Sequence, residues 1–377
     1  MKKVVSIVLN NFTNDSRVLK ENVSLKKAGY DVIVVALYAN GLAKDETVDG
    51  VRVIRVELGY DKEAVGEGIR RFLNYISFIR RLSRYVNSYS PDIVHCNDID
   101  TLPVGVYIKK FINNNIKIVY DSHEYQTEQN LNYIMHRLIK LDESYCIKYA
   151  DRVITVSNSI AEEYKRIYKI DKPCLVLNSP NIYTQPQKKN LLREKLGIKK
   201  KSKIIIFQGM FGKIRKLDVI LDCFMTRQED NVVIVFMGWG ELINDVIYAA
   251  NNSPNIFYQE TVSIEELLDY TSSADYGIAL VSDECLSYKF SLPNKFFEYA
   301  MAGLPIISSG SDEMKAMIDK YQMGVVARDI SVTSIDTAIN EILNLDYNLM
   351  SNNARRCAEE NSWDVQEKKL LELYSTI

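Results

Sequence analysis

The segment SLPNKFFEYAMAGLPIISS (Ser291–Ser309) contains the pattern that decides the fold. Pro293 suits a first helical turn and Gly303 suits the position after a helix, and the apolar run LPIISS follows as a short strand. At about 100° per residue, Glu298 falls on a stripe of small and polar residues, nearly opposite Phe296. We therefore expect Glu298 on the open face of the helix, about two turns from an N-terminus that attracts anions.

The same alternation of strand and helix patterns extends along the whole chain. VVSIVL, DVIVVAL and DIVHC are continuous apolar runs of the kind found in parallel sheets covered on both faces, and TVDGVRV predicts one antiparallel hairpin. The polar, proline-containing stretch NSPNIYTQPQKKN interrupts the alternation, which resumes at KIIIFQG. We predict two doubly wound, Rossmann-like α/β domains, over residues 1–180 and 201–362, joined by a linker at 181–200 and followed by a helix at 363–377.

Composition excludes several classes of protein. The 377 residues include 47 Lys and Arg against 49 Asp and Glu, without the basic excess of a protein that coats nucleic acid. The six cysteines show no CxxC spacing, which favours free thiols in a reducing compartment. No run approaches the roughly 18 apolar residues that a membrane span needs, so we predict a cytoplasmic protein.

The stretch FQGMFGKIRKLDVIL offers the clearest anion site. Gly209 and Gly212 permit close approach of the backbone, and Arg215 presents a planar fork for two phosphate oxygens, with Lys216 next to it. A diphosphate would fit this loop, although the GxxxxGK[ST] spacing of a P-loop is absent. An ordinary turn with solvated basic side chains fits the same letters.

Other polar residues follow strands more loosely. Gly238 and Gly240 form a lone GxG, which is weak evidence for a nucleotide. His123 directly follows a strand and so lies at a carboxyl end, where ligands of such sheets bind. Asp98 and Asp100 resemble a metal-binding DxD pair, but solvated acids after a strand are commoner, and we predict no metal site.

The helical pattern IRRFLNYISFIRRLSRY carries an apolar stripe and a crowded basic face. It fits a domain helix with a solvated basic face, or a patch that contacts anionic lipid headgroups. The arginines of this face are Arg70, Arg71, Arg80, Arg81 and Arg84.

Taken in order, several segments resemble the retaining, nucleotide-sugar-dependent glycosyltransferases of the GT-B fold, in particular family 4. They are DSRVLKENVSLKKAGYDVIVVA, DSHEY, ADRVITVSNSIAEEY, FQGMFGKIRKLDVIL and, most specifically, SLPNKFFEYAMAGLPIISS. The resemblance covers nearly the whole chain. The last helix, 363–377, resembles the segment that crosses back onto the first domain in this family.

The resemblance implies roles for individual residues. The donor would lie mainly in the second domain, where Arg215 would clamp its diphosphate and Glu298 would bind the ribose hydroxyls, while His123 would reach the transferred sugar. His123 and Arg215 are thus the implied catalytic residues, and Asp15 and Arg17 would face the acceptor from a loop. The implied donor-binding residues are Gly209, Gly212, Arg215, Lys216, Gly238, Ser291, Leu292, Asn294, Lys295 and Glu298.

Two positions depart from the family pattern. Members commonly carry Glu-x7-Glu, whose first acid contacts the donor sugar, but Phe290 stands eight residues before Glu298. Arg215 is followed at once by Lys216, where a branch of the family tends to have glycine. Lys295 is a further cation that could approach the phosphates.

The expected activity is retaining transfer of a sugar from a nucleoside-diphosphate sugar, UDP by default, with no metal and no cofactor. The acceptor would be a hydroxyl of a glycan or of a lipid-linked acceptor in bacterial surface polysaccharide synthesis, with peripheral contact to the inner face of the cell membrane. Two alternatives remain open at this point. One is a nucleotide-sugar-binding partner subunit with weak or no catalysis, which Phe290 suggests, and the other is a nucleotide-sugar 2-epimerase.

Overall fold

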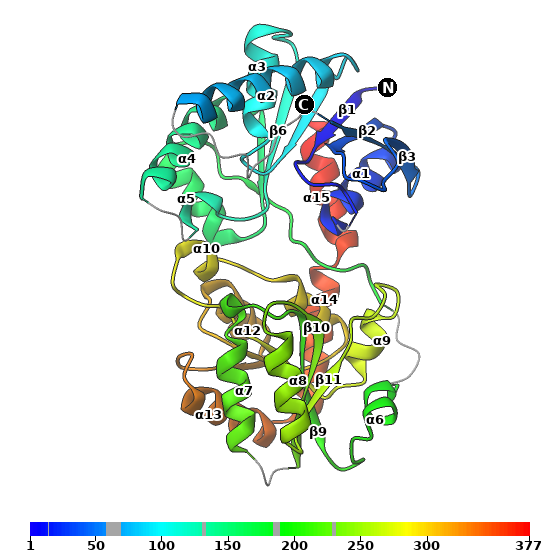
Figure 1. The fold of residues 1–377 in the computed structure, drawn as a ribbon, viewed down its shortest axis with the longest axis vertical. Helices are drawn as coiled ribbons and strands as arrows, with labels where there is room; N and C mark the ends of the chain where they lie inside the picture. The colour runs from blue at the N-terminus through cyan, green and yellow to red at the C-terminus, as the bar shows by residue number, and fades with distance from the viewer. Residues whose placement is uncertain (14, 58–68, 130–132, 184–188, 228–230) are drawn as a thin grey trace. The chain divides into compact units, whose positions relative to one another are not determined.

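The computed structural model describes residues 1–13, 15–57, 69–129, 133–183, 189–227 and 231–377. The chain forms two compact units (Figure 1). Unit 1 comprises Met1–Val176 and Glu367–Ile377, and unit 2 comprises Leu177–Gln366.

Unit 1 is built on an eight-stranded sheet in the order β3-β4-β2-β1-β5-β6-β7-β8. Every pairing is parallel except that of β3 with β4, which confirms the predicted hairpin. The strands are β1 (Lys3–Ile7), β2 (Asp31–Leu37), β3 (Asp45–Val48), β4 (Val51–Val56), β5 (Ile93–Asn97), β6 (Lys117–Ser122), β7 (Arg152–Thr155) and β8 (Cys174–Leu175).

Helices connect the parallel strands of unit 1, as continuous apolar strands require. They are α1 (Ser16–Lys27), α2 (Ile69–Asn87), α3 (Leu102–Phe111), α4 (Tyr133–Cys146) and α5 (Asn158–Tyr168), with 3₁₀ turns η1 (Gln126–Glu128) and η2 (Ile147–Tyr149). Gly29 follows α1 with φ of 94°, a left-handed value that is common just after the end of a helix. The final helix α15 (Trp363–Ser375), red in Figure 1, brings Tyr374 to His95 on β5, with Oη 2.6 Å from Nδ1.

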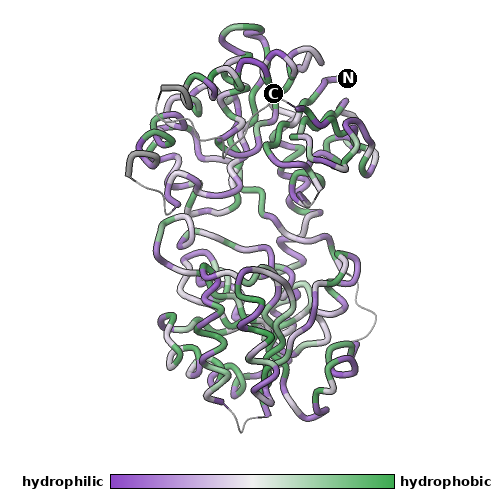
Figure 2. Tube along the Cα trace, in the orientation of Figure 1, coloured by the Kyte–Doolittle hydropathy of each residue, from purple (hydrophilic) through white to green (hydrophobic). Residues whose placement is uncertain are grey.

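Unit 2 contains a wholly parallel six-stranded sheet in the order β11-β10-β9-β12-β13-β14. Its central strands are among the most hydrophobic stretches of the trace in Figure 2, and β9 is buried from Ile204 to Gln208. The strands are β9 (Lys203–Met210), β10 (Val232–Trp239), β11 (Ile256–Gln259), β12 (Tyr276–Ala279), β13 (Ile306–Ser308) and β14 (Gly324–Val326).

The helices of unit 2 begin inside the predicted linker, where residues 191–196 form α6, while residues 184–188 lie outside the described residues. They are α6 (Leu191–Leu196), η3 (Lys213–Arg215), α7 (Leu217–Thr226), α8 (Ile243–Asn252), α9 (Leu267–Ser272), α10 (Leu286–Lys289), α11 (Asn294–Met301), α12 (Asp312–Tyr321), α13 (Val332–Asn344) and α14 (Tyr347–Glu360).

Each sheet reverses its strand order once, between β1 and β5 in unit 1 and between β9 and β12 in unit 2. Doubly wound sheets bind ligands beyond the carboxyl ends of the strands at such a reversal. All six cysteines are free thiols, as predicted. Among the described residues, every helix falls short of the length and hydrophobicity of a membrane span.

Candidate functional site

The first group of polar residues lies beyond the carboxyl end of β9 in unit 2. Gly209 has φ of 107°, a left-handed value that glycine adopts at little cost. Gly212 caps the 3₁₀ turn that contains Arg215, and Lys216 follows with φ of 49°. Lys216 Nζ donates to Glu284 Oε1 at 2.7 Å, so this lysine already has an anionic partner on unit 2.

Helix α11 brings Lys295 to the same loop. A Cβ added at Gly209 would lie 3.9 Å from Lys295 Nζ, so glycine leaves room beside the amine. The amine lies 3.8 Å from the centroid of the Phe207 ring, and among the described residues it has no hydrogen-bond partner. Burial, reinforced by the nearby positive charge of Arg215 and opposed by Glu298, holds the pKa of Lys295 well below its usual range.

This burial corrects the expected exposure of α11. Helical periodicity placed Glu298 on the open face of the helix, but Lys295, three residues before it, is only 8 % exposed. The reason is that α11 packs against α9, α14, β12 and β13, so most of its circumference is covered. Among its residues Glu298 is half-buried and Asn294, at its first turn, is exposed.

Glu298 is held in place by a glutamine on the neighbouring strand. Gln208 Nε2 donates to Glu298 Oε2 at 2.6 Å, and Gln208 Oε1 accepts from Thr271 Oγ1 at 2.7 Å. The glutamine backbone N–H donates to Tyr299 Oη at 2.9 Å. Since both ends of the amide are fixed, the carboxylate of Glu298 is oriented before any ligand binds.

The predicted strip before α11 adopts a turn. Ser291 Oγ donates to the Tyr288 carbonyl at 2.8 Å, and Leu292 is buried. Phe290 is the half-buried residue that ends α10. Pro293, which lacks an N–H, occupies the N-cap of α11, so the first free backbone donors of this helix begin at Asn294.

In the neighbouring loop, Gly238 of β10 lies directly opposite Gly209 in the sheet. A Cβ added at Gly238 would come within 1.9 Å of the Gly209 carbonyl oxygen. Only glycine therefore allows the two backbones to approach this closely. This packing explains Gly238, which in the sequence was only weak evidence for a nucleotide site.

Unit 1 presents a second group around His123, which follows β6. His123 Nε2 lies 3.1 Å from Asp121 Oδ2, and Nδ1 lies 3.5 Å from Asp98 Oδ2. The His123 backbone N–H also donates to Asp98 Oδ1 at 3.2 Å. Burial favours the neutral ring, but the two carboxylates outweigh it and raise the pKa of His123 to about 10.

Arg17 shares the Asp121 partner of this histidine and lies on a helix, which corrects its predicted place on a loop, while its role toward the acceptor stays a prediction. It belongs to α1, is 3 % exposed and makes a bidentate contact to Asp121 at 2.9 and 3.1 Å. Burial opposes ionisation of Asp121, but the Arg17 guanidinium holds the pKa of this carboxyl well below its usual range. Asp15 is the N-cap of α1 and accepts from the Val18 N–H at 3.2 Å.

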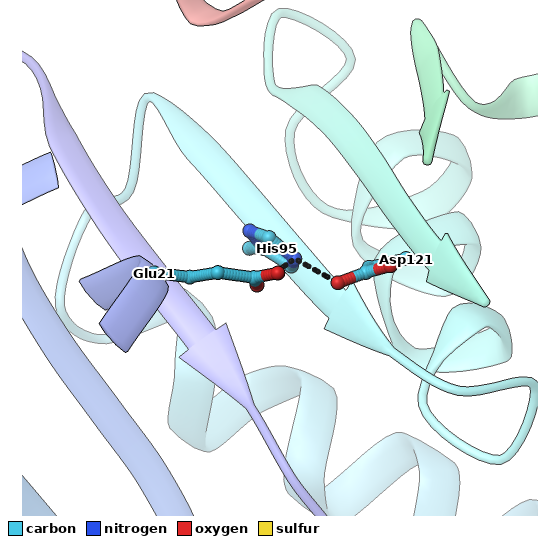
Figure 3. Close-up of side chains that lie close together, drawn as sticks. All are labelled: Glu21, His95 and Asp121. Atoms are coloured by element: carbon cyan, nitrogen blue, oxygen red, sulfur yellow. Dashed lines mark ion pairs between the residues drawn. The ribbon is translucent and has the colours of Figure 1, made fainter. Parts of the chain in front are cut away.

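A buried cluster completes the group (Figure 3). Glu21 on α1 and Asp121 on β6 approach His95 from opposite sides, with His95 Nε2 3.7 Å from Glu21 Oε2 and 3.9 Å from Asp121 Oδ2. Their ligand atoms lie within 4.8 Å of one another, the spacing of a metal site. Arg17 Nη2 already lies 3.0 Å from Glu21 Oε1, so a metal ion would meet a fixed positive charge.

A proton on Glu21 suits this cluster better than a metal ion. Burial, together with the neighbouring Asp121 charge, raises the pKa of Glu21 to about 8 despite the opposing effect of Arg17. Burial also lowers the pKa of His95, which keeps its ring neutral. The cluster is therefore a fixed polar base on which Asp121 and His123 are positioned.

Comparison with known proteins agrees with this architecture. Residues 23–178 match the model of Glycosyltransferase Family 4, and residues 224–372 match the model of the Glucosyltransferase 3-like, C-terminal domain. No curated protein matches the chain. Sucrose-phosphate synthase from Thermosynechococcus elongatus superimposes with a TM-score of 0.79 at 16 % identity, over 100 % of this chain and 99 % of that one. The chain is a GT-B glycosyltransferase that resembles family 4.

Two further structures have the fold of this glycosyltransferase. HepE of Anabaena, in complex with UDP-glucose, is 12 % identical with a TM-score of 0.75, over 100 % of both chains. WaaG, described as a glycosyltransferase involved in lipopolysaccharide biosynthesis, is 14 % identical with a TM-score of 0.68, over 97 % of this chain and 98 % of that one. At these identities the likeness shows the fold, and the roles of individual residues remain predictions.

Sequence reasoning missed several residues of the glycosyltransferase that orient others. Gln208 ends the apolar run KIIIFQG, and a polar side chain at the end of a buried strand was the available signal. Asp121 ends the run KIVYD in the same way. Glu21 gave no such signal, because its neighbours His95 and Asp121 are distant in the sequence and only the fold assembles them.

Proposed function

We propose that this glycosyltransferase moves a sugar from a nucleoside-diphosphate sugar to an acceptor hydroxyl, with UDP as the default nucleotide. The observation that carries the proposal is Lys295, a buried amine without a hydrogen-bond partner among the described residues, beside Gly209 and near Arg215. An amine in this state gains most from an anion that replaces its lost hydration. A diphosphate beyond the carboxyl end of β9 would supply that anion.

Different residues around Lys295 would bind different parts of the donor. Arg215 and Lys295 would neutralise the charge that grows on the leaving diphosphate, which is the usual electrostatic contribution to such a reaction. Glu298 is an acceptor-only group when ionised, so it suits the two ribose hydroxyls and not a phosphate. Its fixed contact with Gln208 would keep it oriented for this purpose.

We infer that transfer retains the anomeric configuration without a carboxylate nucleophile. Phe290 stands where an acid would be expected to contact the donor sugar, and we assign no second acid to that place. Asp98 and Asp121 pair with the two ring nitrogens of His123 and keep the ring protonated at neutral pH, so we propose that its positive charge polarises the transferred sugar and that the ring is not a nucleophile. The leaving phosphate would then assist deprotonation of the acceptor, with no metal and no cofactor.

For the acceptor we propose a glycan or a lipid-linked hydroxyl in bacterial surface polysaccharide synthesis, reached from the cytoplasmic face of the membrane. The second half of α2 exposes Arg80, Arg81 and Arg84, and its described first half exposes Leu73 and Ile76. Basic and apolar side chains on one helix suit an anionic lipid surface. The side chains of Arg70 and Arg71 lie outside the described residues.

Turnover by a substituted enzyme tests the proposal. After a thermal-shift screen identifies a donor, Arg215→Ala should lower kcat by about 100-fold or more, the usual cost of removing one transition-state charge partner. Lys315→Ala, which removes an exposed lysine on α12, should leave turnover unchanged and serves as the matched control. Full turnover by Arg215→Ala would contradict the assignment.

A further inference from the structure

An exposed indole lies at the edge of the proposed donor site. Trp239, the last residue of β10, is 62 % exposed, whereas the other tryptophan, Trp363, is 5 % exposed. Its partner on β9 is Met210, which is 55 % exposed. Paired residues on neighbouring strands lie about 4.8 Å apart and point to the same face of the sheet, so two exposed apolar side chains begin next to each other at this edge.

Backbone contacts fix this surface in place. The Phe211 N–H donates to the Trp239 carbonyl at 2.6 Å, and the Leu242 N–H donates to the Phe211 carbonyl at 3.1 Å. A Cβ added at Gly240 would lie 2.6 Å from both the nitrogen and the oxygen of Phe211. The loops after β9 and β10 are therefore clamped together, and the exposed side chains between them belong to a rigid edge.

The position of this edge suggests its ligand. Met210 lies two residues beyond Gln208 on β9, about 6.6 Å along the strand, and Gln208 contacts Glu298. A ribose held by Glu298 would carry its base roughly that far from the carboxylate. A planar base gains stacking energy on an aromatic face, and a rigid surface costs little entropy to use.

We propose that Trp239, with Met210 beside it, is the stacking platform for the nucleobase of the donor. This inference rests on the proposed function and adds the surface that would bind the base. Stacking accepts any planar base, so the platform supplies affinity while selection among bases depends on other groups. It also explains an indole that projects into solvent from a loop that glycines hold rigid.

Fluorescence tests the platform directly, because the chain has two tryptophans. In a Trp363→Phe background, the emission of Trp239 should change on titration with UDP and stay unchanged on titration with pyrophosphate, which lacks a base. UDP binding that leaves the emission unchanged would overturn the platform while the proposed function stands. If neither UDP, ADP nor GDP binds by calorimetry, the proposed function fails and the platform fails with it.

Substitution gives the second test and does not depend on the Trp363→Phe variant. Trp239→Ala should weaken UDP binding by roughly 5- to 100-fold, the loss expected for one stacked base, and leave pyrophosphate binding unchanged. Trp239→Phe should recover most of the affinity. Tyr248→Ala removes an aromatic residue of α8 that is 66 % exposed and should leave the affinity unchanged. Equal UDP affinities of Trp239→Ala and the unsubstituted protein would overturn the platform.

Discussion

Replacing Lys295 with methionine should stabilise the protein and weaken donor binding at the same time. The side chain keeps its length, but the buried amine without a hydrogen-bond partner is removed. An unsatisfied buried polar group costs about 1–3 kcal/mol. The amine also lies 3.8 Å from the centroid of the Phe207 ring, and losing this contact should cost about 1–2 kcal/mol of the gain. A methionine sulfur near the same ring should restore part of that loss.

The net gain in the free energy of unfolding should be about 1–2 kcal/mol, or about 2–8 °C in Tm for a unit of this size. Its pH dependence has a definite sign. Because the folded state lowers the pKa of Lys295, the unfolded state binds more protons between that value and about 10.4, and native stability rises with pH across this window. The advantage of Lys295→Met should therefore be largest at acidic pH and smallest near pH 10, where only the cost of the uncharged amine without a partner is left.

Chemical denaturation between pH 5 and 10 measures the stability, and calorimetry with the donor diphosphate measures the affinity. Loss of one charge-assisted contact should weaken binding by about 10- to 100-fold. The matched control is Lys315→Met, on the exposed surface of α12, which should change neither quantity. A Lys295→Met protein that is less stable at every pH and binds the diphosphate normally would refute the reasoning.

Further predictions concern the fixed parts of the two units. Glu21→Gln should remove the titration of this buried carboxyl. Between pH about 4.5 and 8 the folded state binds a proton that the unfolded state has lost, so the stability of the unsubstituted protein should fall relative to the variant, by up to about 1.4 kcal/mol for each unit that the pH rises. Parallel curves of stability against pH for the two proteins would argue against a protonated Glu21. Gly240→Ala should lower Tm, because the added Cβ would clash with the Phe211 backbone at a cost of about 2 kcal/mol or more. Gly212→Ala should leave Tm unchanged, because the space around its Cβ is open. Equal melting curves of the two variants would contradict the close approach of Gly240 to Phe211. Arg17→Ala should cost about 3–5 kcal/mol in urea denaturation because it breaks a buried ion pair. Arg52→Ala at an exposed ion pair should leave the urea midpoint nearly unchanged, and similar shifts of the two variants would contradict the difference in burial.

The sequence predicted correctly those features of the fold that depend on residues close together in the chain. The continuous apolar runs predicted buried parallel strands, and both sheets contain them. The hairpin of β3 and β4 also follows from its own letters, since its turn and its pairing lie within a dozen residues. In these cases the residues that determine the structure are neighbours in the chain.

The predictions that were wrong concern side chains whose burial depends on residues far away in the sequence. Helical periodicity placed Glu298 on an open face, but four elements cover α11, so Glu298 is half-buried and Lys295 is buried. Arg17 was predicted to lie on a loop, and its burial against Asp121 could not be foreseen because this partner is 104 residues away. No spacing rule connects such positions, and only the sheet order brings α1 and β6 together.

The account is tested most directly by calorimetric titration of the unsubstituted protein and of Arg215→Ala with nucleoside diphosphates and their sugars. We predict that at least one of UDP, ADP and GDP binds the unsubstituted protein at a single site, and that Arg215→Ala weakens its binding by about tenfold or more. Absence of binding by all three, or identical affinities of the two proteins for the one that binds, would contradict a donor site beyond the carboxyl end of β9.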